Sequence, residues 1–243
     1  MTTDALKQLW MLTFGDSAEF VDLFFATAYD PRRCRFLSNG ELPTAALYWL
    51  DTEYLGQKFA YIYGVATHPD HRNQGLCRKL MQKTHEALHQ QGYAGALLMP
   101  AKPGLRQMYG KMGYRECSRL REFDCTAEST VAVHAIDKEE YARLRREFLP
   151  EGGVIQEGEN LDYLLTYAQV YRGDDFLLAA VHEDGHLYGM ELLGNREAAG
   201  GILAALGCKS GSFRCPGREI PFGMFLPLAE NAAEPGYLGL VFD

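Results

Sequence analysis

The sequence has little that would place the protein in a membrane or an oxidising compartment. No apolar run reaches about 18 residues, the length that a membrane-spanning helix requires. The N-terminal residues Met1-Thr2-Thr3-Asp4 lack the basic and then apolar segments of a signal peptide. Six cysteines are scattered without a CxxC pair, so neither a disulfide framework nor a zinc site is expected. We therefore expect a protein of the reducing cytoplasm, without membrane contact and without bound metal.

Positive charge is too sparse for a nucleic-acid-binding protein. The 243 residues hold 24 Lys and Arg against 32 Asp and Glu, and no basic stripe carries interleaved aromatic residues. The charge also divides unevenly: residues 1–125 have a net charge of +2, and residues 126–243 have −10. The first half therefore suits a polyanionic cofactor, whereas the acidic second half either attracts a cationic acceptor or serves solubility. With 47% apolar residues, the chain can bury one large core or two small ones.

The most informative stretch is residues 59–88, which predict a strand, a polar turn and a helix. Residues 59–63, FAYIY, are typical of a buried strand, and apolar residues recur at helical spacing from Leu76 onward. A helix that begins directly after a strand leaves backbone N–H groups without partners, and with its dipole it forms an anion site. Arg72 and Arg78 add positive charge, and Gly75 allows close approach to the backbone. The turn lacks the Gly-Lys-Ser/Thr ending of a nucleotide P-loop.

Two motifs in the first half of the chain resemble those of the GNAT N-acetyltransferase superfamily. Arg72-x-x-Gly75-x-Cys77 is similar to the family's (Arg/Gln)-x-x-Gly-x-(Gly/Ala) pyrophosphate motif. About 30 residues later, residues 109–114, YGKMGY, resemble the closing Tyr-x-(Lys/Arg)-x-Gly-(Phe/Tyr) motif. Cys77 departs from the family's Gly or Ala, but its side chain is small enough for close approach. The resemblance covers roughly residues 4–125 and implies acetyl-CoA as co-substrate.

The resemblance also implies which residues form the site. Tyr109 matches the residue that protonates the leaving thiolate, whereas Tyr114 is expected to pack. The backbone N–H groups of residues 65–67 would contact the thioester carbonyl and the pantetheine arm. The implied cofactor-binding residues are Val65, Ala66, Thr67, Arg72, Asn73, Gln74, Gly75, Leu76, Cys77 and Arg78.

The general base is not identified by the sequence. Glu41, Asp51 and Glu53 lie on a predicted hairpin that should face the acceptor cleft, yet each is equally typical of a solvated surface acid. In three-domain relatives the base is the C-terminal carboxylate, but that role is not carried over to Asp243, because the domain that supplies it is expected to be absent. The histidine pairs at 85/89 and 182/186 are interpreted as surface residues, since two ligands do not make a metal site.

The predicted fold class is α/β (α+β), with a GNAT-like mixed central sheet flanked by helices. Asp16 or Ser17 is a plausible helix cap, and Asn39-Gly40 is a strong hairpin signal. Residues 1–125 are expected to form the catalytic domain. Its predicted elements are helices at 4–13, 17–29 and 104–112, the strand, turn and helix described above, and strands at 94–99 and 114–125.

Residues 126–243 are interpreted as a second, degenerate GNAT-like domain. The junction Gly194-Asn195-Arg196 lacks a phosphate-binding pattern, so this domain should bind no cofactor of its own. The tandem arrangement resembles the enhanced-intracellular-survival acetyltransferases without their sterol-carrier-like domain. The predicted elements are helices at 138–148 and 195–206, and strands at 131–133, 176–181, 186–193, 211–215, 221–228 and 237–242.

These observations predict an acetyl-CoA-dependent N-acetyltransferase that moves an acetyl group to a primary amine by direct transfer in a ternary complex. The acceptor stays open between an aminoglycoside-like or polyamine-like small molecule and a peptide or protein lysine, and so does the oligomeric state. Two alternatives also remain. One is a non-catalytic acyl-CoA-binding sensor module, and the other is an acyltransferase with a bulkier acyl donor.

Overall fold

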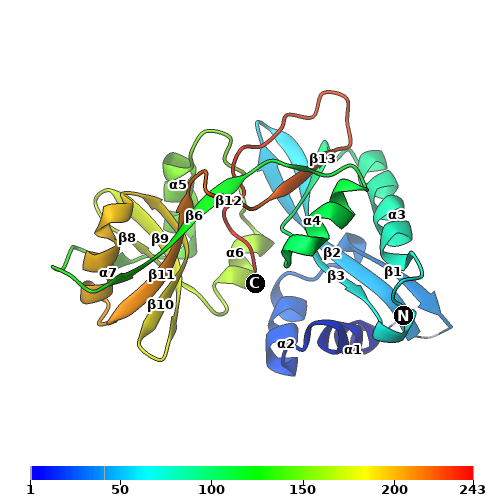
Figure 1. Ribbon diagram of the computed structural model, residues 1–243, viewed down its shortest axis with the longest axis horizontal. Helices are drawn as coiled ribbons and strands as arrows, with labels where there is room; N and C mark the ends of the chain where they lie inside the picture. The colour runs from blue at the N-terminus through cyan, green and yellow to red at the C-terminus, as the bar shows by residue number, and fades with distance from the viewer. Residues whose placement is uncertain (1, 41, 243) are drawn as a thin grey trace.

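The chain forms two sheet-centred units that lie side by side, as the computed structural model shows for residues 2–40 and 42–242 (Figure 1). The first unit lies on the right of Figure 1 with helices α1 to α4, and the second lies on the left with α5 and α7. Both sheets are mixed and both are flanked by helices, so the predicted fold class is confirmed. Among the described residues, no helix combines the length and apolarity that crossing a membrane would need.

The first unit follows the predicted order of elements. Ser17 caps the second helix, because its Oγ accepts a hydrogen bond of 3.2 Å from the backbone N–H of Phe20. Its elements are α1 (Thr3–Phe14), α2 (Ala18–Thr27), η1 (Pro31–Arg33), β1 (Cys34–Asn39), β2 (Leu42–Tyr54), β3 (Gln57–Thr67), η2 (Pro69–His71), α3 (Leu76–Gln90), β4 (Gly95–Leu98) and α4 (Pro103–Gly110). Strands β1 and β2 flank the Asn39-Gly40 turn, as predicted.

Side chains alternate along β2, and those on both faces of the first sheet are buried. Tyr48 and Leu50 pack in the core that includes α1 and α2, whereas Leu47 and Trp49 pack in the core that includes α3 and α4. The strand therefore has an almost continuous apolar sequence.

Strands β3 and β4 separate after a short region of pairing. They run parallel and pair only between residues 59–61 and residues 95–97. Beyond this point residues 62–67 have no β4 partner, so alternate backbone N–H and C=O groups face a gap between the strands. The gap opens toward the N-terminus of α3, because α3 follows β3 in the chain.

A bulge bends β3 beside this gap. The register passes from Tyr48 opposite Tyr63 to Ala46 opposite Ala66, so one β2 residue faces both Gly64 and Val65. Gly64 has φ of 57°, and a Cβ there would lie 2.9 Å from the indole ring of Trp10. Glycine therefore allows both the positive φ and the close packing of α1 against the bulge.

The second unit repeats the crossover of the first. β10 and β11 are parallel and are joined through α7, as β3 and β4 are joined through α3. The elements are β6 (Arg119–Thr126), β7 (His134–Ala135), α5 (Lys138–Phe148), α6 (Glu159–Leu164), β8 (Gln169–Arg172), β9 (Phe176–Glu183), β10 (His186–Gly194), η3 (Arg196–Ala198), α7 (Ala199–Ala205), β11 (Ser210–Pro216) and β12 (Ile220–Pro221). Helix α6 and strand β8 were not predicted, and the strand expected at 131–133 is instead found at 134–135.

The two units exchange strands on both sides of residue 125, where the domain boundary is expected. The strand expected at 114–125 is divided into β5 (Arg115–Glu116) of the first sheet and β6 of the second. Later in the chain, β13 (Met224–Pro227) inserts between β4 and β5 of the first sheet. The chain passes from the first sheet to the second at Ser118. The buried Oγ of Ser118 accepts a hydrogen bond of 2.9 Å from the N–H of Gly223. Residues 119–125 therefore belong to the second sheet, and residues 224–227 belong to the first.

Residues 237–242 form no named strand, in contrast to the prediction, and make one isolated bridge between Tyr237 and Gly153. They run through the middle of the molecule between the two units (Figure 1).

Candidate active site

A cavity of about 340 Å³ opens where β3 and β4 separate, and we call it the splay pocket. Three parts of the chain that are distant in sequence meet there: the N-terminal helices, the separated strands with α4, and Phe242. The lining residues are Trp10, Phe14, Asp16, Phe20, Tyr61, Ile62, Tyr63, Gly64, Val65, Leu98, Met99, Ala101, Leu105, Tyr109 and Phe242. The pocket thus combines a stretch of β3 that has no β4 partner with three tyrosines and a carboxylate.

The predicted strand residues reach this pocket to different extents. Val65 lines it, whereas Ala66 is buried in the core and Thr67 is half-buried outside the lining. All three lie on the part of β3 that has no β4 partner. Their backbone groups are therefore the ones available beside the pocket.

The predicted phosphate turn forms an exposed loop at the N-terminus of α3. Gly75 is the residue that opens the helix, with φ of 75° and no side-chain cap, and the first turn holds no acidic residue. A Cβ on Gly75 would meet no atom within 4 Å, so the approach to this backbone is open. Arg72, Asn73, Gln74 and Arg78 are exposed, and Leu76 and Cys77 are half-buried behind them. A helix N-terminus with its dipole and two exposed arginines is an arrangement that suits an anion, as the sequence predicts for this turn.

Tyr109 lies at the end of α4 with its ring 6% exposed and lining the splay pocket. Burial, and to a lesser extent the neighbouring Cys77, raises the pKa of Tyr109 well above its usual value of 10. The phenol is therefore protonated at neutral pH and can act as a proton donor. Burial likewise raises the pKa of the Cys77 thiol, which disfavours a nucleophilic thiolate at this position.

Tyr114 and His85 support the position of Tyr109. The Tyr114 ring packs edge-on against Tyr109 at 5.8 Å between centroids, and its hydroxyl lies 2.9 Å from Nε2 of His85. Tyr114 is therefore a packing residue, as predicted. His85 is half-buried instead of lying on the surface, and burial lowers its pKa to about 4. In the part of the chain that the structure describes, no three His, Cys, Asp or Glu side chains are grouped to hold a metal ion.

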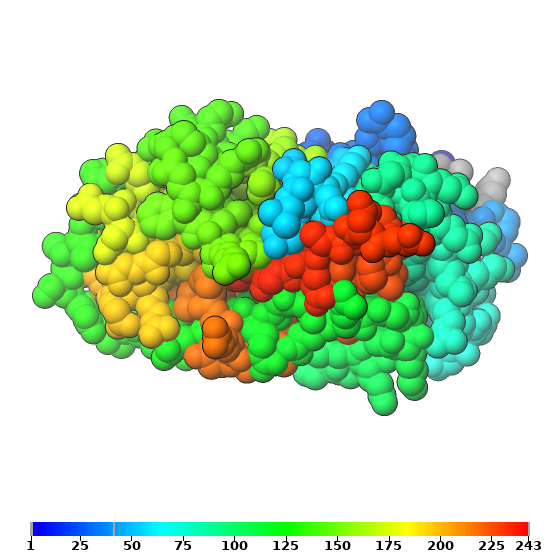
Figure 2. All heavy atoms as spheres, turned by 90° about the horizontal axis from the view of Figure 1, so that it is seen from above, coloured from blue at the N-terminus to red at the C-terminus, as the bar shows by residue number. Residues whose placement is uncertain are grey.

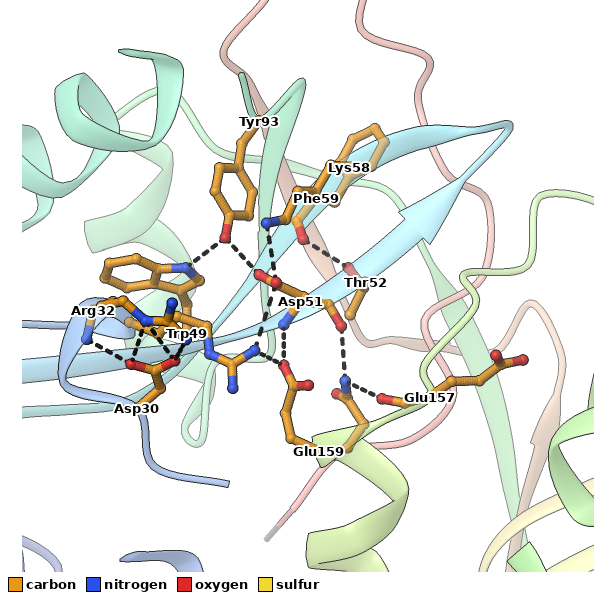
Figure 3. Close-up of polar contacts among 12 residues, drawn as sticks. Asp30, Arg32, Trp49, Asp51, Thr52, Lys58, Phe59, Tyr93, Glu157 and Glu159 are labelled. Atoms are coloured by element: carbon orange, nitrogen blue, oxygen red, sulfur yellow. Dashed lines mark hydrogen bonds and ion pairs between the residues drawn. The ribbon is translucent and has the colours of Figure 1, made fainter. Parts of the chain in front are cut away.

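The predicted candidates for the base lie away from the splay pocket. Asp51 accepts a hydrogen bond of 2.5 Å from the hydroxyl of Tyr93 and forms an ion pair of 3.0 Å with Lys58 (Figure 3). Its backbone N–H also donates to Glu159 of the second unit, so Asp51 belongs to a contact between the units. Glu53 lines a separate cavity with residues of the second unit. Glu41 lies outside the described residues, as does Asp243.

Asp16 is the carboxylate that the structure brings to the splay pocket. It lies in the loop between α1 and α2, and its Oδ2 accepts a hydrogen bond of 2.7 Å from Nε1 of Trp10. From the sequence, Asp16 was predicted only as a helix cap. Gly15, with φ of 82°, turns the chain so that Asp16 folds back toward Trp10. Sequence spacing does not predict that Asp16 lines the pocket, because its place there depends on where the loop meets β3.

The second unit differs where the first has its phosphate turn. β10 is followed by η3 after Asn195 alone, whereas residues 68–75 separate β3 from α3. The cavity at this junction is lined by Asp174, Asp175 and Glu197, and Asn195 is bound to Asp175 by a hydrogen bond of 2.8 Å. An acidic lining disfavours a phosphate group here.

A larger cavity of about 650 Å³ lies on the second sheet, and we call it the acidic cleft. Phe20 lines both the acidic cleft and the splay pocket, so the two cavities meet at this ring. The cleft carries the carboxylates of Glu122, Asp124 and Glu183, and Arg214 pairs with Glu122 at 3.0 Å. Its other lining residues include Tyr167, Tyr188 and Phe213. It therefore suits a ligand with both cationic and apolar parts.

Comparisons with known proteins agree with this arrangement. Residues 2–117 match the model of a family described as acetyltransferase (GNAT) domain. The search of curated proteins found no significant match. Among solved structures, a GCN5-related N-acetyltransferase from Kribbella flavida has 18% identity and a TM-score of 0.68, and the alignment covers 93% of this chain and 69% of that one.

Two further structures show the same similarity across both units. A GCN5-related N-acetyltransferase from Anabaena variabilis has 13% identity and a TM-score of 0.67, with 94% of this chain and 71% of that one covered. Eis1 from Mycobacterium abscessus has 11% identity and a TM-score of 0.64, with 93% and 70% covered. At these identities the similarity demonstrates a shared fold. The family model confirms the predicted resemblance for residues 2–117, and the shared fold across both units agrees with the predicted tandem arrangement.

Proposed function

We propose, because residues 2–117 match the GNAT acetyltransferase family model, that the protein transfers an acetyl group from acetyl-CoA to a primary amine. One observation carries this proposal: the unpaired part of β3 leads directly into the turn before α3, and its Val65 lines the splay pocket together with Tyr109, which gives a path from the turn to the phenol. The cofactor has a polyanionic end and a reactive thioester end, and this path offers groups suited to each.

The residues that would hold acetyl-CoA fit its chemistry. The exposed loop Arg72–Gly75 and the first turn of α3, residues 76–78, would bind the pyrophosphate through N–H groups and charge. The backbone of residues 65–67 would bind the pantetheine arm and the acyl carbonyl. When bound, acetyl-CoA supplies an acyl group activated as a thioester. The free cysteines of the described chain accord with a reducing cytoplasm, where we place the protein.

The chain's own side chains have distinct roles in this proposal. Asp16 orients the amine by accepting a hydrogen bond from it, and Trp10 fixes the Asp16 carboxylate for that purpose. Tyr109 donates its proton to the sulfur as the carbon–sulfur bond breaks and the carbon–nitrogen bond forms. Solvent water takes up the amine proton through the open cleft and returns a proton to the Tyr109 phenolate. We propose direct transfer because the nearby Cys77 is held as a thiol.

The acceptor would approach through the acidic cleft. Its carboxylates favour a cationic acceptor, and its meeting with the splay pocket at Phe20 provides a path for the amine. Small-molecule amines and peptide lysines both meet these requirements.

The test is a thiol-trapping assay of CoA release from acetyl-CoA with a panel of amines. The panel contains a polyamine, an aminoglycoside, a lysine peptide and a neutral primary amine. Amine-dependent CoA release with acetylated product supports the proposal. Tight acetyl-CoA binding without turnover on any amine would favour a non-catalytic sensor, and faster turnover of a longer acyl-CoA would favour a bulkier donor.

A further inference from the structure

We infer that a buried ion pair in the second unit, Arg145 with Glu191, positions residues 237–242 at the splay pocket. The inference rests on the proposed function, since the splay pocket is the proposed transfer site. The second unit would then help to build that site without binding a cofactor itself.

The ion pair is fully enclosed. Arg145 on α5 and Glu191 on β10 are 2% and 1% exposed. Nε and Nη2 of Arg145 donate to the two carboxylate oxygens at 2.6 and 2.9 Å, which is a bidentate arrangement. The hydroxyl of Tyr141 donates to Glu191 as well, at 3.2 Å. Burial alone would lower the pKa of Arg145, but the Glu191 carboxylate outweighs burial and raises it, so the arginine stays charged.

Residues 237–242 are bound directly to this pair. The Tyr237 hydroxyl donates to Glu191 at 3.2 Å, and a Cβ on Gly239 would lie 1.8 Å from a Glu191 oxygen. The backbone of the segment therefore passes against the carboxylate, with space only for glycine. Gln156, which also accepts from Arg145 at 3.3 Å, binds both the C=O and the N–H of Leu240, at 2.7 and 3.2 Å.

The segment then reaches the splay pocket. The carbonyl oxygen of Phe242 accepts a hydrogen bond of 2.7 Å from the hydroxyl of Tyr63, and the Phe242 ring lines the pocket. The ring also contacts Tyr61, Tyr63 and Tyr163, with centroids 5.4 to 5.9 Å away. Tyr61 and Tyr63 lie on β3 beside the Gly64 bulge. A continuous set of contacts thus joins the Arg145–Glu191 pair to the strand that would hold the acyl group.

Stability alone does not account for such a pair. Removing two charges from water is costly, and apolar residues of similar volume often give an equally stable or more stable core. What apolar residues cannot supply is the set of directed hydrogen bonds to Tyr237 and Gln156. The pair therefore fits a role in fixing the position of one segment.

The test replaces the pair by apolar residues of similar volume, as Arg145→Met/Glu191→Leu. The matched control is Arg143→Met/Glu147→Leu, which removes an exposed ion pair of 2.8 Å from the same helix. Three quantities are measured in the full chain: amide hydrogen exchange of residues 237–242, the Kd of acetyl-CoA, and kcat and KM for an amine that the wild type acetylates. If the apolar variant does not fold, Gln156→Leu replaces it, because it leaves the ion pair intact.

The expected result is a change confined to the segment and the acceptor. Exchange of residues 237–242 should rise at least tenfold and the amine KM at least tenfold, while the acetyl-CoA Kd stays within twofold; the control should change none of these. Unchanged exchange would overturn the inference, and so would faster exchange with unchanged amine kinetics. A wild type without amine turnover would instead refute the proposed function, and exchange would still decide whether the pair holds the segment.

Discussion

The hydroxyl of Tyr63 donates a hydrogen bond of 2.7 Å to the carbonyl oxygen of Phe242, 179 residues further along the chain. Burial raises the pKa of Tyr63 well above its usual value of 10, so the hydroxyl keeps its proton and remains a hydrogen-bond donor at every physiological pH. Tyr63 directly precedes the Gly64 bulge, and Phe242 follows the segment bound by the second unit. The hydrogen bond therefore joins the two units at the wall of the splay pocket. Figure 2, from above, shows the red C-terminal part of the chain extending from the surface of the first unit toward the second.

The first prediction concerns the phosphate turn. Arg72→Ala should weaken acetyl-CoA binding by roughly 1–3 kcal/mol, the value of a charge-assisted hydrogen bond. Gly75→Val should abolish binding, because valine is strained at φ of 75° and its side chain covers the backbone N–H groups. Isothermal titration with acetyl-CoA measures both. Lys83→Ala, an exposed change later on α3, is the control. Unchanged affinity in both variants would contradict the assignment of the turn.

The second prediction is that one acetyl-CoA binds per chain. The second unit has the parallel crossover but has Asp174, Asp175 and Glu197 at the position of the phosphate turn. Like charges would repel the pyrophosphate, so the titration should give a stoichiometry near one. Asp175→Asn should leave that value unchanged, because the loop that would bind phosphate is also missing. A stoichiometry near two in the wild type would contradict the prediction.

Features that depend on neighbouring residues could be predicted from the sequence. The helix at 138–148 was predicted at both ends from its amphipathic pattern, and in the structure Asp137 caps its N-terminus by accepting a hydrogen bond of 2.8 Å from the N–H of Glu140. The strand, turn and helix from residue 59 onward were recognisable for the same reason, because they follow one another in the chain. The geometry of the predicted phosphate turn is therefore largely a local property of residues 59–78.

Features that depend on distant pairing could not be predicted. β13 resembles any short apolar strand, and nothing within residues 224–227 specifies insertion between β4 and β5. The break at Ser118 likewise lies inside one apparent strand. Asp16 and Phe242 reach the splay pocket only because α1 and the end of the described chain converge on β3. Such convergence is a result of tertiary packing and leaves no pattern in the local sequence.

The third prediction concerns Asp16. Asp16→Asn keeps the size of the side chain and an oxygen for Trp10, but it removes the negative charge that would orient the amine. The kcat/KM for the amine should fall about 10- to 100-fold, the effect of losing a hydrogen bond to a charged group, while the KM for acetyl-CoA should stay within about twofold. Steady-state kinetics with each substrate varied separately measure this. The control is Glu19→Gln, an exposed change on α2. An equal loss for both substrates would indicate a structural effect instead.

The fourth prediction concerns the pH dependence of stability. Burial lowers the pKa of His85 to about 4 from the usual 6.5, so the folded protein holds the neutral ring. The contribution of His85 to the free energy of unfolding is fully present above pH 6.5. It is lost as the pH falls toward 4, which lowers the free energy of unfolding by up to about 3 kcal/mol. Urea unfolding at pH 7.5, 6 and 5 should show a steeper loss of stability in the wild type than in His85→Gln. His89→Gln, an exposed change on the same helix, should match the wild type. Equal slopes in all three proteins would contradict the prediction.

The last prediction concerns Tyr109, which lines the splay pocket with a protonated phenol. Tyr109→Phe keeps the ring and its packing against Tyr114, and it removes only the proton donor. Acetyl-CoA affinity should stay nearly unchanged, because the hydroxyl acts as the carbon–sulfur bond breaks. Turnover should fall by about 10²- to 10⁴-fold, the usual contribution of a positioned general acid. Rapid-quench measurement of acetyl transfer, combined with titration of acetyl-CoA, separates the two effects.

Tyr114→Phe is the matched control, because it removes a neighbouring hydroxyl that is bonded to His85 and does not line the pocket. It should lower stability and leave the transfer rate within a few-fold of the wild type. A loss in Tyr109→Phe confined to KM would mean that the hydroxyl serves ground-state binding. If both variants lost turnover equally, the two tyrosines would share a packing role. In that case water or another residue would supply the proton to the leaving sulfur.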